Sequence, residues 1–314
     1  MSVSTVAPRV SVLMTAFNRE SLIAESIESV LAQTMTDFEL VIVDDCSTDG
    51  TVRVVQRYLS DPRVRLVQNE RNLGDYPNRN HAATLAGGEF LKYHDSDDVM
   101  YPHCLEIMVQ ALERYPAADF AMSCERSWPG GPVPMLLTPR MCYQREFLGT
   151  TGLFNQGPSS AMFRTRRFHE LGRFPQSGPY SDGLFWLRAC TTCSVVLTQA
   201  NLIYYRIHQG QEMNAAGPRA HAEFDGVLFR ALDAPECPLS LEEREQAKRN
   251  MAWGVLKNAL FDFRDGQSSL ALYRLRRSTL SAAEWLKYAR RQRRVPSAGT
   301  PANEASARVI REHA

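Results

Sequence analysis

The sequence predicts an α/β protein with a mixed, mostly parallel sheet flanked by helices and a helical extension at the C-terminal end. Three observations lead to this fold class. Short apolar runs alternate with helically spaced apolar residues in the N-terminal third, which is the pattern of strands joined by crossover helices. Polar turns rich in aspartate follow two of those runs. From residue 218 onward the apolar spacing is helical.

The strands and helices of the N-terminal part can be placed individually. The apolar runs predicted to be strands span residues 10–14, 38–43, 64–67 and 89–93. Helical spacing predicts helices from Leu22, Val52 and His81, and residues 69–77, rich in Asn, are predicted to be a loop. Because the carboxyl ends of parallel strands meet at one sheet edge, we expect the polar residues that follow these strands to lie together.

The C-terminal third is predicted to be a set of helices. They span residues 221–232, 241–263 and 270–288. Trp253, Leu256 and Leu260 form one apolar stripe, which we expect to pack against the preceding domain. The predicted divisions of the chain are an α/β domain over 8–212, a helical region over 213–294 and a disordered tail over 295–314.

Charge is distributed unevenly along the chain. The net charge is +1, but residues 274–294 carry eight Arg or Lys side chains against Glu284 alone, a balance of +7, so the remainder carries −6. A basic helical segment containing Trp285 and Leu286 could lie on an anionic membrane surface, although a solvated basic face is the commoner alternative. No nucleic-acid partner is predicted, because the body is acidic and no recognition motif occurs.

The cysteines and the N-terminus indicate the expected cellular compartment. The seven cysteines are scattered at positions 46, 104, 124, 142, 190, 193 and 237. That distribution suits a reducing compartment, and the Cys190 and Cys193 pair, although it has redox spacing, is predicted to be incidental thiols. With no long apolar stretch at the N-terminus, we expect a cytoplasmic protein, with a peripheral place at the inner face of the membrane as an open alternative.

An acidic cluster follows the fourth predicted strand. Asp95, Asp97 and Asp98 fall within four positions, and two like charges about 5 Å apart at an effective dielectric near 20 repel by about 3 kcal/mol. Asp97 or Asp98 could cap a helix that begins near Pro102. Alternatively the cluster shares a divalent cation, and the acidic turn after the second strand favours this interpretation, because both turns would meet at one sheet edge.

Four motifs carry a resemblance to a known family. They are VSVLMTAFN at 10–18, FELVIVDDCSTDGT at 38–51, NRNHAATLAGGEFLKYHDSDD at 78–98 and GPYSDGLFWLRA at 178–189. Together they resemble the family 2 glycosyltransferases, inverting enzymes of the GT-A fold that use nucleotide sugars. Phe17 stands where that family usually has Tyr, Cys46 where it has Gly, and Ser181 where it often has Glu.

The resemblance implies roles for residues at the strand ends. The implied nucleotide contacts are Thr15, Ala16, Asn18, Asp45, Arg79, Asp95 and Ser96. Asp45 would accept a hydrogen bond from a uracil or thymine N–H, which favours a UDP- or dTDP-type donor, while a capped turn is its alternative. Asp97 and Asp98 would contact Mn²⁺ or Mg²⁺, hard cations that prefer oxygen ligands. His208 would approach the metal or the diphosphate, or else be a surface residue, and Arg79 has the same surface alternative.

An inverting transfer also needs one general base on the acceptor side. By the resemblance this base is Asp182, although Asp182 could instead only cap the helix that begins at Gly183. Residues 157–160 are expected to face the sugar, and His94 is expected to be structural. The sequence thus predicts a metal-dependent inverting glycosyltransferase of the hexosyltransferase class, acting on a saccharide, lipid-linked or other hydroxyl acceptor, in bacterial polysaccharide or glycoconjugate biosynthesis. A sugar nucleotidyltransferase and a non-catalytic nucleotide-sugar-binding protein are the alternatives.

Overall fold

A mixed sheet forms the centre of the molecule in the computed structural model, which describes residues 7–123, 132–149, 152–208, 211 and 217–289. The order of its eight strands is β3-β2-β1-β4-β8-β6-β9-β7. Their bounds are β1 Val10–Ala16, β2 Phe38–Asp44, β3 Val64–Gln68, β4 Phe90–Asp95, β6 Phe120–Ser123, β7 Met135–Leu137, β8 Ala161–Arg164 and β9 Val195–Thr198. The four predicted strands are present, and the predicted mostly parallel α/β class with C-terminal helices is confirmed.

The parallel half of the sheet sets the position of the polar motifs. β1 pairs in parallel with both β2 and β4, and β2 pairs in parallel with β3. Beyond β4, β8 runs antiparallel to both β4 and β6, and β6 pairs in parallel with β9. The carboxyl ends of β1, β2 and β4 therefore lie side by side at one edge.

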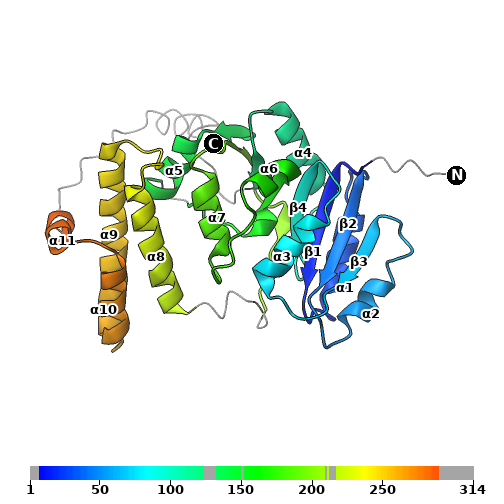
Figure 1. Cartoon of the computed structure of the whole chain (residues 1–314), viewed down its shortest axis with the longest axis horizontal. Coiled ribbons are helices and arrows are strands. Elements are labelled where there is room, and N and C mark those ends of the chain that lie inside the picture. The colour runs from blue at the N-terminus through cyan, green and yellow to red at the C-terminus, as the bar shows by residue number, and fades with distance from the viewer. Residues whose placement is uncertain (1–6, 124–131, 150–151, 209–210, 212–216, 290–314) are drawn as a thin grey trace, which may run out of the picture.

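Helices cover both faces of this sheet (Figure 1). Their bounds are α1 Ile23–Leu31, α2 Thr51–Gln56, α3 Asp75–Thr84, α4 Cys104–Arg114, α5 Pro139–Phe147, α6 Thr165–Glu170 and α7 Ser181–Ala189. One apolar core joins the sheet to α3, α5, α6 and α7, and a second joins its other face to α1, α2 and α4. The two cores follow from strand alternation, since Leu91 and Tyr93 belong to the first and Phe90 to the second.

Two predictions for this part of the chain are corrected. α3 begins at Asp75, inside the predicted loop, because Pro77 lies in its first turn, where a missing N–H leaves no helical hydrogen bond unmade. The helix-cap interpretation of Asp97 and Asp98 is wrong: α4 begins at Cys104 after His103, with no side-chain cap. The acidic cluster leads instead into β5 (Val99–Met100), which pairs with β10 (Ile203–Tyr204).

The C-terminal helices form the end of the molecule opposite β2 and β3 (Figure 1). They are α8 Pro218–Asp233, α9 Leu241–Arg264, α10 Ser268–Arg277 and α11 Ala282–Ala289, so the predicted helix over 270–288 is two helices. Among the described helices, none combines the length and apolar character needed to cross a bilayer. The domain boundary predicted at 212–213 and the predicted tail over 295–314 lie outside the described residues.

The predicted apolar stripe of α9 does not pack inward. Trp253 and Leu260 are 43% and 60% exposed. The buried face of α9 consists of small side chains, Ala252, Val255 and Ala259, which allow α8 and α10 to approach closely. The prediction failed because the size of the side chains, rather than their hydrophobicity, determines which face of this helix is buried.

Candidate active site

Strand register brings the three polar motifs to one sheet edge. Thr15 at the end of β1 pairs with Asp95 at the end of β4, and the neighbouring Ala16 pairs with Asp44 at the end of β2. The amide of Asp45 donates to the carbonyl of Ala16 at 2.8 Å, which ties the turn after β2 to the end of β1. The site that the sequence places at this edge is therefore assembled by the parallel half of the sheet.

A buried guanidinium neutralises the first carboxylate of the acidic cluster. Arg79 of α3 lies 2.8 Å from Asp95 and 2.7 Å from Asp75. Burial alone would raise the pKa of Asp95, but the Arg79 guanidinium holds that pKa below its usual value. With its side chain only 12% exposed, Arg79 is not a surface residue. Asp95 is thus held ionised and oriented from the α3 side.

Asp97 contacts an arginine and a histidine side chain from distant parts of the chain. Arg19 Nε lies 3.0 Å from Asp97 Oδ2, and His208 Nε2 lies 3.0 Å from the same oxygen. Arg19 follows β1 and His208 follows β10, so Asp97 joins both ends of the α/β domain. The structure brings the predicted His208 to the acidic cluster.

Asp98 is buried, and only one of its two carboxylate oxygens has a hydrogen-bond partner among the described residues. Its Oδ1 accepts a hydrogen bond from the Arg206 amide at 3.0 Å. Its Oδ2 is buried and has no hydrogen-bond partner among the described residues. Burial raises the pKa of Asp98 to about 7, and the Asp95 and Asp97 carboxylates add to this effect. An unpaired buried carboxylate oxygen is costly unless another group binds it.

Asp97, Asp98 and His208 could supply only part of a metal site. In the described part of the chain, no group of three or more His, Cys, Asp and Glu side chains is placed so that it could hold a metal ion. However, Mg²⁺ is commonly held by one or two carboxylates together with substrate phosphates and water. The unpartnered Oδ2 of Asp98 beside Asp97 and His208 fits such a shared site, in which the protein supplies only some of the ligands.

Asp45 clamps the loop that precedes α3. It is 3% exposed, and its Oδ1 accepts from Asn69 Nδ2 at 2.7 Å and from the Leu73 amide at 2.8 Å. Its Oδ2 accepts from the Gly74 amide at 2.9 Å. Each carboxylate oxygen can accept two hydrogen bonds, so the second acceptor position of Oδ2 remains for a ligand donor.

Replacement of Asp45 by alanine is expected to lower the free energy of unfolding by about 2–4 kcal/mol, because three donors lose a charged acceptor. Urea denaturation followed by circular dichroism measures this change. Asp37→Ala, which removes one exposed hydrogen bond to the Arg9 amide, is the control and should change little. If Asp45→Ala lowered the free energy of unfolding no more than the control does, Asp45 would not hold the loop before α3 in place.

The turns after β1 and β2 hold each other in place. Asn18 has φ of +53°, a left-handed conformation that Asn adopts more readily than most residues. Its Oδ1 accepts from the Thr48 amide at 2.8 Å, and its amide donates to Ser47 Oγ at 2.9 Å. Cys46 has φ of +66°, which explains why glycine is the natural residue at this turn.

Asp182 lies near α3, whose Arg79 also contacts Asp95 of the acidic cluster. It sits in the first turn of α7 and accepts a hydrogen bond from the Gly183 amide at 2.7 Å, but the helix has no side-chain N-cap. It also accepts a hydrogen bond from Tyr76 of α3 and interacts electrostatically with Arg79. Burial raises the pKa of Asp182 to about 6. Asp182 is therefore a carboxylate poised to accept a proton near neutral pH.

The predicted sugar-facing turn is anchored from β4. The ammonium of Lys92, fully buried, donates to the carbonyls of Tyr93 and Ser159. The Ser159 hydroxyl in turn hydrogen-bonds Asp95. His94, on the same face of β4 as Lys92, is also fully buried, and burial lowers its pKa to about 3, so it is neutral. The turn over 157–160 is thus fixed beside the acidic cluster.

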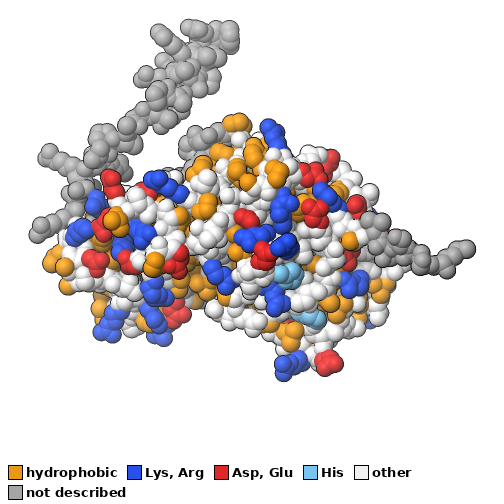
Figure 2. Space-filling model, turned by 45° about the horizontal axis from the view of Figure 1, so that its top comes forward, with side chains coloured by type: hydrophobic (Ala, Val, Ile, Leu, Met, Phe, Trp, Pro, Cys, Tyr) orange, Lys and Arg blue, Asp and Glu red, His pale blue; other side chains and the backbone are white. Residues whose placement is uncertain are grey.

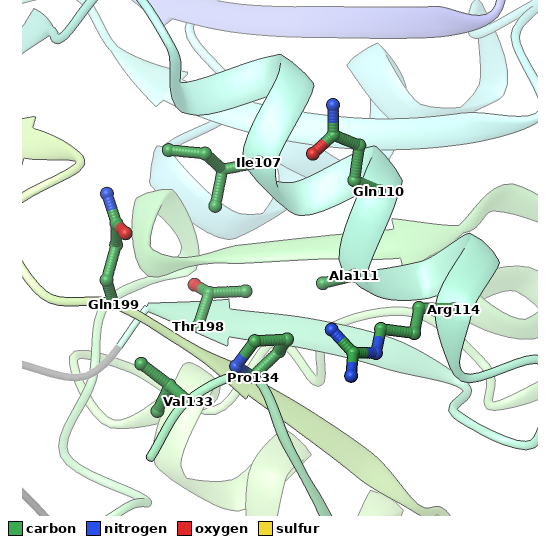
Figure 3. A pocket seen from close by; sticks show the side chains of 8 residues that line it. All are labelled: Ile107, Gln110, Ala111, Arg114, Val133, Pro134, Thr198 and Gln199. Carbon is green, nitrogen blue, oxygen red and sulfur yellow. The ribbon is translucent and has the colours of Figure 1, made fainter.

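A cavity of about 240 Å³ lies elsewhere, between α4 and the end of β9 (Figure 3). Gln110 and Arg114 of α4, Thr198 and Gln199 give it polar groups, and Ile107 and Pro134 give it apolar walls. None of the predicted site residues lines it. The cavity is therefore separate from the candidate site.

Sequence reasoning missed three residues that shape this site: Arg19, Tyr76 and Arg206. Arg19 and Arg206 carried a signal, since Arg19 directly follows a quoted polar motif and Arg206 lies two residues before the predicted His208. Tyr76 carried none, because it lies in a segment predicted to be a loop.

A mostly parallel sheet with an acidic cluster at the carboxyl ends of its strands defines the chain as a protein of the GT-A fold. Residues 11–172 match the pattern of Glycosyl transferase family 2. The chain belongs to this family.

Curated relatives share part of the chain. The putative glycosyltransferase EpsE of Bacillus subtilis is 40% identical over 110 residues, 34% of this chain and 40% of that protein. The poly(ribitol-phosphate) β-N-acetylglucosaminyltransferase TarS of Staphylococcus aureus is 27% identical over 213 residues, 66% of this chain and 37% of that protein. The chain thus spans less than half the length of either relative.

Solved structures share the fold over nearly the whole chain. The structure of TarS 1–349 from S. aureus with UDP-GlcNAc has a TM-score of 0.59 at 22% identity, covering 85% of this chain and 89% of that one. The mannosyltransferase PcManGT from Pyrobaculum calidifontis with GDP-Man and Mn²⁺ has a TM-score of 0.58 at 19% identity, covering 90% and 88%.

Proposed function

We propose that this protein transfers a sugar from a nucleoside-diphosphate sugar to a hydroxyl acceptor with inversion at the anomeric carbon, in bacterial polysaccharide or glycoconjugate synthesis. The observation that carries the proposal is the presence of two unlike carboxylate environments near Arg79 of α3. Asp97 and Asp98 belong to the acidic cluster that follows β4. Asp182 is buried with a pKa of about 6.

The nucleotide is proposed to lie over the carboxyl ends of β1 and β2. Thr15, Ala16 and Asn18 border this position, and the free acceptor position of Asp45 Oδ2 suits the ring N–H of uracil or thymine. Asp95 and Ser96 are proposed to contact the ribose. Arg79, which pairs with Asp75 and Asp95, acts by orienting Asp95. The UDP-GlcNAc bound by the similar TarS structure supports a UDP-type donor.

A divalent cation, Mn²⁺ or Mg²⁺, is proposed to be held by Asp97, Asp98 and His208 together with the donor diphosphate. Such an ion stabilises the negative charge of the departing diphosphate as a Lewis acid. The chain's own groups orient these ligands: the Arg206 amide fixes Asp98, and Arg19 fixes Asp97. The Mn²⁺ in the mannosyltransferase structure supports this proposal.

Asp182 is proposed to be the general base. The acceptor oxygen forms a bond to the anomeric carbon as the bond from that carbon to the diphosphate oxygen breaks, and the hydroxyl proton passes to Asp182. A carboxylate near pKa 6 is mostly ionised at neutral pH and still basic enough to take this proton. The hydrogen bond from Tyr76 aims Asp182. The acceptor is proposed to be a saccharide, a lipid-linked sugar or another hydroxyl compound.

The membrane contact predicted for residues 274–294 stays a prediction. In the described part of that segment, Arg274 pairs with Asp262 and is 7% exposed, and Tyr288 is 1% exposed. Leu286 is 67% exposed. Much of the segment's predicted membrane-facing side is therefore used to pack α10 and α11 against α9.

A thermal-shift screen tests the proposed donor site. The screen compares UDP-GlcNAc, dTDP-glucose and GDP-mannose, each with and without Mn²⁺. Donors with one type of base should raise the melting temperature more than the others. A donor of that type at about 100 times its Kd should stabilise the fold by about 2.7 kcal/mol. Mn²⁺ should increase the stabilisation. If no donor raises the melting temperature, the proposal fails. Pyrophosphate release from a nucleoside triphosphate would favour a nucleotidyltransferase, and tight binding without turnover would favour a non-catalytic binding protein.

A further inference from the structure

The outward face of α9 combines large apolar side chains with basic ones. Trp253, Leu260 and Phe261 are 43%, 60% and 43% exposed, and Lys257 and Arg264 are exposed between them. Spacings of three and four residues place all five on one side of the helix. We call these five residues the α9 stripe. The helical core does not need them, because Ala252, Val255 and Ala259 fill the opposite, buried face.

The basic groups of the α9 stripe lie against its aromatic ring. Arg264 Cζ is 4.9 Å and Lys257 Nζ is 5.9 Å from the centroid of the Phe261 ring. In this arrangement the charged ends of both side chains lie near the Phe261 ring, within the distance of a cation–π contact. The stripe therefore presents positive charge at the rim of an apolar strip.

One exposed acidic side chain pairs with the α9 stripe: Asp265, which follows α9, lies 3.0 Å from Arg264. From Asn250 to Arg264 the sequence of α9 contains one carboxylate, Asp262, and its side chain is 15% exposed and pairs with Arg274 of α10 at 3.0 Å. α10, which packs beside α9, repeats the mixture with Leu272, 48% exposed, and Arg276 one turn later. Figure 2 shows hydrophobic, basic and acidic side chains interspersed over this helical end of the molecule.

We propose that the α9 stripe binds the surface of an anionic lipid bilayer. Aromatic and aliphatic side chains interleaved with Lys and Arg on one helix face are what an interfacial helix needs to enter the headgroup region while its charges contact anionic lipids. A helix of 24 residues offers roughly 36 Å of length to that surface. α9, α10 and α11 lie at the end of the molecule away from β2 and β3, so the sheet does not obstruct this approach (Figure 1).

Charge favours a lipid surface over a second copy of the chain. In a two-fold contact the same patch would face itself, which would set Lys257 and Arg264 near their own counterparts. Like charges across an interface are unfavourable. An anionic bilayer complements them instead.

Vesicle flotation of the full chain tests this proposal. The protein should bind vesicles made of equal parts phosphatidylcholine and phosphatidylglycerol, bind phosphatidylcholine vesicles far less, and lose binding as salt rises. The double variant K257Q/R264Q should lower the partition coefficient by about fivefold to 30-fold, since each basic residue near an anionic surface contributes about fivefold and Asp265 already offsets part of the charge of Arg264. The double variant W253S/F261S should lower it by roughly tenfold or more through lost apolar burial.

Matched controls come from the opposite end of the molecule. Leu59, which follows α2 and is 43% exposed, gives L59S as the apolar control. Arg53, whose side chain is 72% exposed, gives R53Q as the basic control, and both should bind like the unmodified chain. Thermal shifts by nucleotide sugars should be the same in all variants, which separates this proposal from the proposed activity.

Three results would overturn the proposal. One is no binding to anionic vesicles by the unmodified chain. Another is unchanged binding by both stripe variants, which would move the contact to another segment such as 274–294. The third is a dimer in analytical ultracentrifugation that the stripe variants abolish while vesicle binding persists, which would make the stripe an interface between copies. Should a double variant fail to fold, L260S alone carries the same test, because Leu260 is the most exposed apolar member of the stripe.

Discussion

Replacing Asp182 by asparagine is expected to reduce kcat of sugar transfer by 10²–10⁴-fold, the usual contribution of a positioned general base. Asparagine keeps the size of the side chain and an oxygen that can accept from Gly183 and Tyr76, the two hydrogen-bond donors to Asp182. It cannot accept the acceptor's proton. Donor binding should be unchanged, since Asp182 is proposed to act on the acceptor side. Steady-state kinetics with a donor identified by thermal shift gives kcat, and the thermal shift itself reports donor binding.

Asp225→Asn is the matched control for this experiment. Asp225 of α8 is another carboxyl whose pKa burial raises, but it faces Arg274 rather than the acidic cluster. Replacing Asp225 should leave kcat within a few-fold of the value for the unmodified chain. Equal rates for Asp182→Asn and the unmodified chain would remove the assignment of the base, and equal losses in both variants would point to folding instead of catalysis.

The same assignment gives a pH dependence with a definite sign. Burial raises the pKa of Asp182 to about 6, and only the ionised form can take a proton. kcat/KM should therefore fall about tenfold per pH unit below pH 6 and level off above pH 7. A pH–rate profile measures this, with Asp182→Glu as a variant that keeps the carboxylate and should retain a profile of the same shape. A profile that rises as pH falls would contradict a base in this position.

The fold was predictable because its signals are local. Each strand of the parallel half is a short, mainly apolar run. Polar turns directly follow β2 and β4, so strand ends and site residues such as Asp45 and Asp98 could be placed together. The contacts that complete the site are not local. Arg19 reaches Asp97 across 78 positions and Arg206 reaches Asp98 across 108. The spacing of residues along the sequence does not predict such long-range contacts.

The α9 stripe shows a different limit of the sequence pattern. A helical apolar stripe predicts a buried face, but α9 carries two such faces, one of small side chains and one of large ones. Tight packing against α8 and α10 favours the small one, because helices joined through Ala and Val approach more closely. Periodicity alone could not choose between Ala252 and Trp253.

Replacing Asp98 by asparagine is expected to abolish the Mn²⁺-dependent part of donor binding. Asp98 Oδ2 is a buried acceptor with no protein partner among the described residues, and an amide nitrogen there would present hydrogens to the cation. Asn can keep the hydrogen bond from the Arg206 amide through its remaining oxygen, so the connection to β10 survives. The free energy of unfolding without ligand should stay equal or rise, because the substitution removes an unpaired buried carboxylate.

Titration calorimetry of UDP with and without Mn²⁺ measures the loss directly. In the unmodified chain Mn²⁺ should tighten UDP binding, and in Asp98→Asn the two affinities should be equal. Asp61→Asn, which removes a surface charge paired with Arg63, should behave as the unmodified chain. If Asp98→Asn kept the full effect of Mn²⁺, the unpaired oxygen would not be a metal ligand, and Asp97 with His208 would have to carry the ion alone. The same titration on Asp97→Asn decides that case, since Asp97 is fixed by Arg19 and His208 at 3.0 Å each and its loss would release both side chains from this carboxylate.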